Sequence, residues 1–183
     1  MKHVAFAAAL AAFAPGPAGA AQWKILPGGA LTFSGVQAGD KFSGRFSRFD
    51  GAISFDPDKL NEAKITIVVD MASAATGDRQ RDAALPGSDW FDVAHFPQAR
   101  FDSRKVVRAG AGYEVVGDLT LRGATREIRL PFTLTIDGAK AQAKGHVGLR
   151  REMFGIGQGD WASGEWIDLD VGVDFDIKAE RTD

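Results

Sequence analysis

The side chains best suited to acid–base or nucleophilic chemistry are scarce in this sequence. It contains 3 histidines, and His3 lies in an N-terminal segment that we expect to be removed. A Ser-His-acid arrangement would have to use His95 or His146, but no G-x-S-x-G nucleophile elbow is present. We therefore interpret both histidines as structural and predict that the protein is not an enzyme. A lipid esterase with one of them as general base is the alternative.

Possible metal ligands gather in one short segment. They are Asp78, Asp82, Asp89, Asp92 and His95. Two arginines, Arg79 and Arg81, are interleaved with the first two carboxylates and offer salt bridges instead. Neither a calcium-loop spacing nor a two-histidine zinc spacing occurs. The segment therefore favours helix capping and surface ion pairs, and we expect no metal.

The glycines of FGIGQG, at positions 155, 157 and 159, superficially resemble a phosphate-binding loop. A dinucleotide fingerprint needs a buried strand before it and a helix after it, whereas Asp160–Gly164 leads towards another strand. We interpret the glycines as a wide turn or bulge and expect no cofactor. The formal net charge of −2 and the lack of a basic run also argue against nucleic acid.

Alternation of apolar and polar residues predicts the elements that hold these side chains. From Ile167 to Ile177 every second residue is apolar, and the same period holds from Ile128 to Ile136. Asp137-Gly138 then predicts a tight hairpin turn. Pro131 has no N–H to donate, which predicts an edge, a bulge or a break in the ladder.

Further strands are predicted along most of the chain. They cover 30–34, 42–49, 51–55, 63–71, 99–107, 112–121 and 141–149. An insertion at 76–96 interrupts them, with a short helix capped by Thr76-Gly77-Asp78 and reaching Leu85. The last residues, Lys178–Asp183, lose the alternation and are expected to fray. The pattern predicts an all-β fold: a single antiparallel barrel with one or two short helices in an insertion.

A barrel of about eight strands is either filled by side chains or left open for a ligand. The sequence has 13 Phe and 4 Trp against 1 Tyr, which suits an apolar core and equally the wall of a hydrocarbon tunnel. The arginines at 122 and 151, or the loop 78–81, are predicted to meet a polar head group at the mouth. The candidate ligand-binding residues are Phe33, Phe42, Phe46, Phe49, Ile53, Phe55, Ile67, Val69, Phe91, Phe101, Leu119, Leu121, Phe132, Leu134, Phe154, Val171, Phe175, Arg122 and Arg151.

The N-terminus has the three parts of a secretory signal: basic Lys2, an apolar run over Val4–Ala14, and small residues at Ala18–Ala20. The run is shorter than the roughly 20 residues of a membrane span, and prolines end it. We expect residues 1–20 to be a cleaved signal peptide and residues 21–183 to form one exported domain. The sequence has 0 cysteines, so packing must stabilise the domain.

Five blocks, in this order, resemble the YceI-like family over nearly all of the region after the signal. They are GRFSRFDGAISFDP (44–57), VVDMASAATGDRQRDAAL (68–85), DWFDVAHFPQARFDS (89–103), GDLTLRGATREIRLPF (117–132) and RREMFGIGQGDW (150–161). The resemblance implies a lipocalin-like barrel in the periplasm whose cavity takes up polyisoprenoid or similar long-chain lipids.

These blocks also look like YceI domains fused to b561-type membrane cytochromes, which implies a quinone-like ligand and a separate cytochrome as a possible partner. Where many family members have histidines near the first two strands, this chain has Pro27-Gly28-Gly29 and Gln37-Ala38-Gly39. That departure puts a head-group role for those histidines in doubt. We thus expect an isoprenoid carrier, with a ligand-free, stress-related partner-binding barrel as the alternative; a homodimer is left open.

Overall fold

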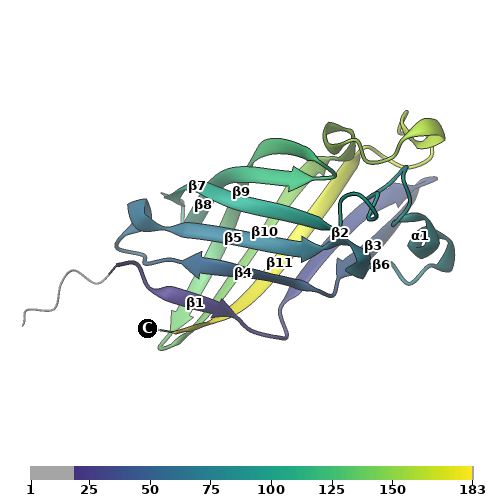
Figure 1. Cartoon of the computed structure of the whole chain (residues 1–183). Coiled ribbons are helices and arrows are strands. Elements are labelled where there is room, and N and C mark those ends of the chain that lie inside the picture. Colours follow the sequence, from purple (N-terminus) through teal and green to yellow (C-terminus); the bar gives the residue numbers. More distant parts are fainter. Residues whose placement is uncertain (1–18, 183) are drawn as a thin grey trace, which may run out of the picture.

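The computed structural model describes residues 19–182, so the predicted signal segment lies almost wholly outside the described residues. Figure 1 shows a long, strongly twisted barrel with small helices at its ends. No helix between residues 19 and 182 combines the length and hydropathy needed to cross a membrane.

The strands are β1 (Gln22–Ile25), β2 (Ala30–Gln37), β3 (Asp40–Phe46), β4 (Phe49–Ser54), β5 (Lys64–Asp70), β6 (Ala74–Ala75), β7 (Gln98–Ala109), β8 (Gly112–Leu121), β9 (Ala124–Asp137), β10 (Lys140–Arg150) and β11 (Asp170–Arg181). The helices are α1 (Arg79–Ala84) and the 3-10 turns η1 (Leu60–Glu62), η2 (Met71–Ser73), η3 (Arg151–Phe154) and η4 (Gly159–Trp161).

The last strand, β11, closes the sheet. Its whole length pairs with β10, while its other edge is divided between two partners. Near its C-terminus Ala179 pairs with Ile25 of β1, and nearer its N-terminus Val173 pairs with Phe33 of β2. The order β1-β4-β5-β7-β8-β9-β10-β11 thus forms a ring, and β2, β3 and β6 extend the wall at one end. All pairings are antiparallel, which confirms the predicted fold class.

Strict alternation along β10 shows why these residues form a wall. Ala143, Val147 and Leu149 face inward, whereas Lys144 and His146 between them are exposed. Successive side chains of a strand point to opposite faces, so this pattern gives the strand one apolar face and one solvent-exposed face. Closing the sheet into a barrel brings the apolar faces of all strands together inside it.

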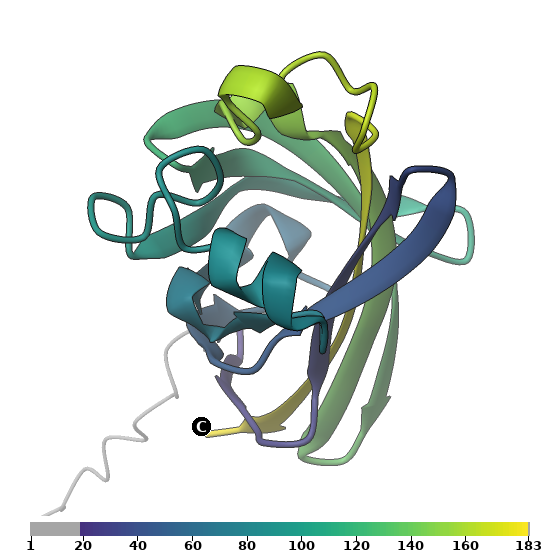
Figure 2. The ribbon, with the colours of Figure 1, turned by 90° about the vertical axis from the view of Figure 1, so that its right-hand side faces the viewer.

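The hydrogen-bonded ladder between β9 and β10 breaks next to Pro131, as predicted. Pairing of β9 with β10 ends at Phe132 opposite Gly145, one residue from Pro131. Beyond that point the first half of β9 pairs only with β8, and the end of β10 pairs only with β11. The 3-10 turn η3 contacts β9 across this opening, and Figure 2 shows the segment above it.

Several strand predictions differ from the structure. The expected strand 42–49 is split, because Ser47-Arg48 turns a corner between β3 and β4. Strand β1 lacked a recognisable alternation and was not predicted. The C-terminus does not fray after Ile177: β11 continues to Arg181 because β1 supplies a hydrogen-bonding partner from the other end of the chain. The predicted helix, in contrast, is present as α1, with Asp78 as its N-cap.

Glycines opposite phenylalanines keep the inner wall thin. Phe33 pairs with Gly44 across β2 and β3, and Phe175 pairs with Gly145 across β11 and β10. In both pairs the ring occupies the place where a Cβ of the glycine would stand. The rings therefore lie flat against the backbone of the neighbouring strand instead of reaching across the barrel.

One end of the barrel is packed by aromatic rings. Phe55 meets Tyr113 edge-on at 5.4 Å between centroids, and Tyr113 stacks on Phe132 at 5.4 Å. Trp23 is buried beside them and donates its indole N–H to the Phe55 carbonyl at 2.9 Å. We call this the packed end; such ring pairs stabilise beyond the area they bury.

The opposite end is built from loops and is called the mouth. The insertion with α1, the β2–β3 hairpin and the 151–169 connection all gather there (Figure 2). A second cluster joins insertion and connection through Phe91, Phe154 and Ile156, which pack on Met71 and Ala99.

Arg151 fixes the 151–169 connection. Its side chain is only 3 % exposed, and its guanidinium donates four hydrogen bonds, all to backbone carbonyls. The acceptors are Ile156, Trp161, Ile167 and Asp168. At Gly157, with φ +82°, any Cβ would collide with the guanidinium, so only glycine lets the loop wrap around it.

We expect Arg151→Met to destabilise the protein by on the order of 3 kcal/mol, because four carbonyls lose a charged donor and stay buried. Arg151→Lys should be nearly as damaging, since one ammonium group has three donors and no planar fork. Urea unfolding followed by tryptophan fluorescence measures both. A shift below about 0.5 kcal/mol, the level of ordinary surface substitutions, would show that the clamp is dispensable.

Candidate ligand-binding cavity

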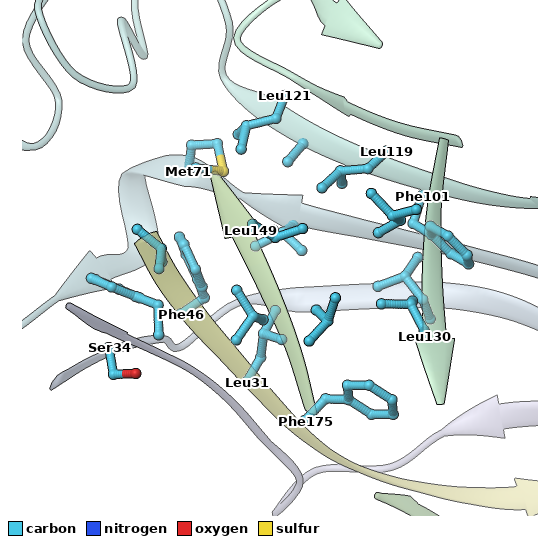
Figure 3. A pocket seen from close by; sticks show the side chains of 18 of the residues that line it. Leu31, Ser34, Phe46, Met71, Phe101, Leu119, Leu121, Leu130, Leu149 and Phe175 are labelled. Atoms are coloured by element: carbon cyan, nitrogen blue, oxygen red, sulfur yellow. The ribbon is translucent and has the colours of Figure 1, made fainter. Parts of the chain in front are cut away.

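The barrel encloses an elongated cavity of about 560 Å³. Its wall runs from Trp23 at the packed end to Arg81 and Trp161 at the mouth. Along β10 alone, lining residues extend from Ala141 to Leu149, which corresponds to about 26 Å of strand. Figure 3 shows leucine, phenylalanine and methionine side chains converging on the space. A cavity of this size and polarity suits one apolar ligand.

The structure brings most of the predicted ligand-binding residues to this wall. Those that line the cavity are Phe33, Phe42, Phe46, Ile53, Phe55, Ile67, Val69, Phe91, Phe101, Leu119, Leu121, Phe132, Leu134, Phe154, Val171, Phe175 and Arg151. They come from β2 to β5, β7 to β9, β11, η3 and the insertion. Whether each touches a ligand stays a prediction.

Two predicted site residues lie elsewhere. Phe49, at the start of β4, is near the backbone of Gly29, outside the cavity wall. Arg122 occupies the β8–β9 turn with a φ of +48° and donates to the Ser88 carbonyl at 2.6 Å. Its Nε is buried without a hydrogen-bond partner. Arg122 therefore ties that turn to the insertion and does not face the lumen.

Arg151 reaches the wall but not as the expected head-group contact. Four backbone carbonyls already accept its hydrogen bonds, and the Trp90 ring lies 5.5 Å from its guanidinium carbon. Burial lowers the pKa of Arg151 from its ordinary value, although a guanidinium remains protonated in proteins. By bonding these carbonyls, Arg151 holds the 151–169 connection in place, and that connection forms part of the mouth.

Several lining residues were missed from the sequence. They include Leu31, Ile65, Ile128, Leu130, Ala143, Val147, Leu149, Val173 and Ile177. All lie in predicted strands or their direct extension, at inward positions of the alternating pattern. These aliphatic side chains were missed because the predicted site was chosen mainly from aromatic residues. Extending the alternation along each strand would have found them.

Polar groups of the wall concentrate at the mouth, where Arg81 connects α1 to the barrel. Its guanidinium donates to Gln37 Oε1 on β2 at 2.9 Å and to Thr76 Oγ1 at 3.3 Å. It also lies 4.9 Å from the centroid of the Phe42 ring on β3. These contacts hold α1 in place. Figure 2 shows α1 lying across the mouth, so the insertion covers this end of the barrel.

The carboxylates of the insertion stabilise its backbone. Asp78 accepts hydrogen bonds from the Gln80 and Arg81 N–H groups, and the Arg81 N–H most strongly lowers the pKa of Asp78. Asp82 accepts from the Thr76 N–H and hydroxyl at 2.7 Å, which lower the pKa of Asp82. Asp78 thus has the capping role expected from the sequence, whereas Asp82 holds the loop that precedes the helix.

The two remaining histidines lie on the outside. His95 is exposed beside Asp92, and the exposed His146 bonds Asp174 at 2.8 Å on the outer face of β10 and β11. Neither belongs to the cavity wall. The residues 155, 157 and 159 of FGIGQG all have positive φ and shape the connection around η3 and η4, in keeping with a turn.

Comparison with known proteins agrees with this architecture. The chain is 40% identical over 95 residues to a UPF0312 protein of Yersinia pestis strain Pestoides F, a match covering 52% of this chain and 50% of that protein. A UPF0312 protein of Photorhabdus laumondii is 37% identical over 95 residues. The chain thus spans about half the length of the curated relatives it matches.

Solved structures match over more of the chain. BcnA of Burkholderia cenocepacia superposes with a TM-score of 0.79 at 28% identity, covering 82% of this chain and 95% of that one. A polyisoprenoid-binding domain from Saccharophagus degradans gives 0.68 at 16% identity, covering 87% and 98% of the two chains. At that identity the second likeness concerns the fold alone. The YceI-like domain matches residues 23–179, so this chain belongs to the YceI-like family.

Proposed function

We propose that the protein binds a long-chain isoprenoid lipid, such as a polyprenyl or quinone-like molecule, and carries it through the periplasm. The observation that supports this best is the 560 Å³ apolar cavity running along the barrel. Each buried CH₂ group contributes about 0.8 kcal/mol, so a prenyl chain gains much by leaving water. Part of this gain is lost to ordering the flexible chain.

The relatives support the chemical class of the ligand. One structural neighbour is described as a polyisoprenoid-binding domain, and this chain shares its fold. A quinone-like ligand would make a separate b561-type cytochrome a natural electron-transfer partner, and a homodimer is compatible with the proposal. Export through cleavage after Ala20 would place the carrier between two membranes.

The rival functions receive less support from the geometry. A ligand-free, partner-binding barrel would be expected to fill its interior with side chains, whereas the glycine–phenylalanine pairs leave this one open. An esterase would need a base beside the ligand, and His95 and His146 are both outside the cavity. We therefore favour binding over catalysis.

Extraction of the native protein tests the proposal directly. Protein purified from an exported fraction without detergent, then denatured and extracted, should release an isoprenoid lipid detectable by mass spectrometry at close to stoichiometric yield. A cysteine-free periplasmic binding protein without such a cavity, expressed and extracted in parallel, controls for carry-over. An extract no richer in lipid than this control would refute the proposed function.

A matched pair on β10 tests whether the lipid occupies the cavity. Val147→Trp adds a bulky side chain to the inner wall, and we expect it to reduce co-purified lipid at least about fivefold, because overfilling a preformed cavity excludes the ligand. Lys144→Trp, on the exposed face of the same strand, is the control. Circular dichroism checks that both fold. Equal lipid content in the two variants would place the ligand elsewhere.

A further inference from the structure

Trp166 is the most exposed large hydrophobic residue of the described chain, with 59 % of its surface accessible. It is not on a loose segment. Its carbonyl accepts a hydrogen bond of 2.8 Å from the Ala38 N–H, and the next residue, Ile167, forms a β-bridge with Gln37. The backbone that carries the indole is therefore held against the tip of the β2–β3 hairpin.

This indole stands directly beside the cavity mouth. Its neighbours Ile167 and Gln37 both line the cavity, and Ile167 is buried. Trp161, another lining residue, shares a small surface hollow with Trp166 and Ala38. Ile167 is buried whereas Trp166 beside it is exposed, so the indole stands at the outer side of the mouth. Figure 2 shows the hairpin and the 151–169 connection flanking the mouth.

We propose that Trp166 anchors the mouth of the cavity to the surface of a lipid bilayer. This inference rests on the proposed lipid-binding function. An indole combines an apolar body with an N–H donor and prefers the membrane–water interface. An isoprenoid chain is soluble only in membranes, so a mouth held against a bilayer lets the chain pass without crossing water.

The charges around Trp166 indicate which bilayer surface fits. Asp160, Glu165 and Asp168 lie on the same connection, and Asp40 and Lys41 of the hairpin offset each other. On α1, across the mouth, Arg79 and Arg81 are matched by Asp78 and Asp82. A surface attracted to anionic lipids carries a cluster of lysines and arginines, and this one does not. The partner is therefore a zwitterionic bilayer held by apolar contact, with little dependence on salt.

Binding to phosphatidylcholine vesicles tests the anchor. The full-length mature protein should sediment with the vesicles, and bilayers brominated on their acyl chains should quench part of its tryptophan fluorescence. Trp166→Ala should weaken vesicle binding by on the order of tenfold and remove this quenching, because an indole leaves the interface. Raising the salt concentration should leave the binding of the unaltered protein within about twofold.

A double variant tests whether the indole must be at the mouth to contact the bilayer. Ala139→Trp adds an exposed indole to the β9–β10 turn, at the packed end, and in a Trp166→Ala background it should not restore quenching. The inference is overturned if the unaltered protein ignores the vesicles, if Trp166→Ala binds them equally, or if binding requires anionic lipid and low salt. Trp166-dependent dimers in light scattering without vesicle contact would also overturn it.

The two proposals can fail separately. Docking is measured on added vesicles and does not depend on what the cavity contains. An empty lipid extract with normal Trp166-dependent docking contradicts only the carrier function, whereas a lipid-filled protein that ignores vesicles contradicts only the anchor.

Discussion

Hydrogen bonding along β11 is the interaction on which the rest of the molecule depends. This one strand pairs with β10 along its length and shares its other edge between β1 and β2. Without that closure the apolar faces of all the strands would meet water. With it, the same faces enclose a continuous lumen. Closure therefore stabilises the fold and creates the cavity in a single step.

Closure alone would allow a barrel packed solid, and the wall chemistry prevents this. Large rings such as Phe33 and Phe175 lie over glycines of the neighbouring strand, so their bulk contributes to the wall without spanning the lumen. The remaining inward side chains are mostly aliphatic. At the mouth, the donors of Arg151 and Arg81 bond backbone carbonyls, Gln37 and Thr76. Polar side chains there organise loops that frame the opening.

Strand alternation predicted the fold class and the long antiparallel strands from β7 to β11, and most of the residues named for the site do line the cavity. It could do so because each of those strands has one dry and one wet face. It failed where structure comes from distant partners: β1 is short, and the end of β11 is ordered by pairing with it. The arginines were harder to place. Their charge suggested a head-group contact, but in the folded chain carbonyls from distant residues surround Arg151, and Arg122 bonds the Ser88 carbonyl.

The ladder break at Pro131 gives the barrel two mechanically different halves. Towards the packed end every neighbouring strand pair is joined by backbone hydrogen bonds, which are directional and lose their energy when stretched. Between the first half of β9 and the end of β10 no such ladder exists, and the η3 segment contacts β9 there instead. The wall on this side of the mouth therefore owes its position to the hydrogen bonds that Arg151 donates within the 151–169 connection and not to a strand partner.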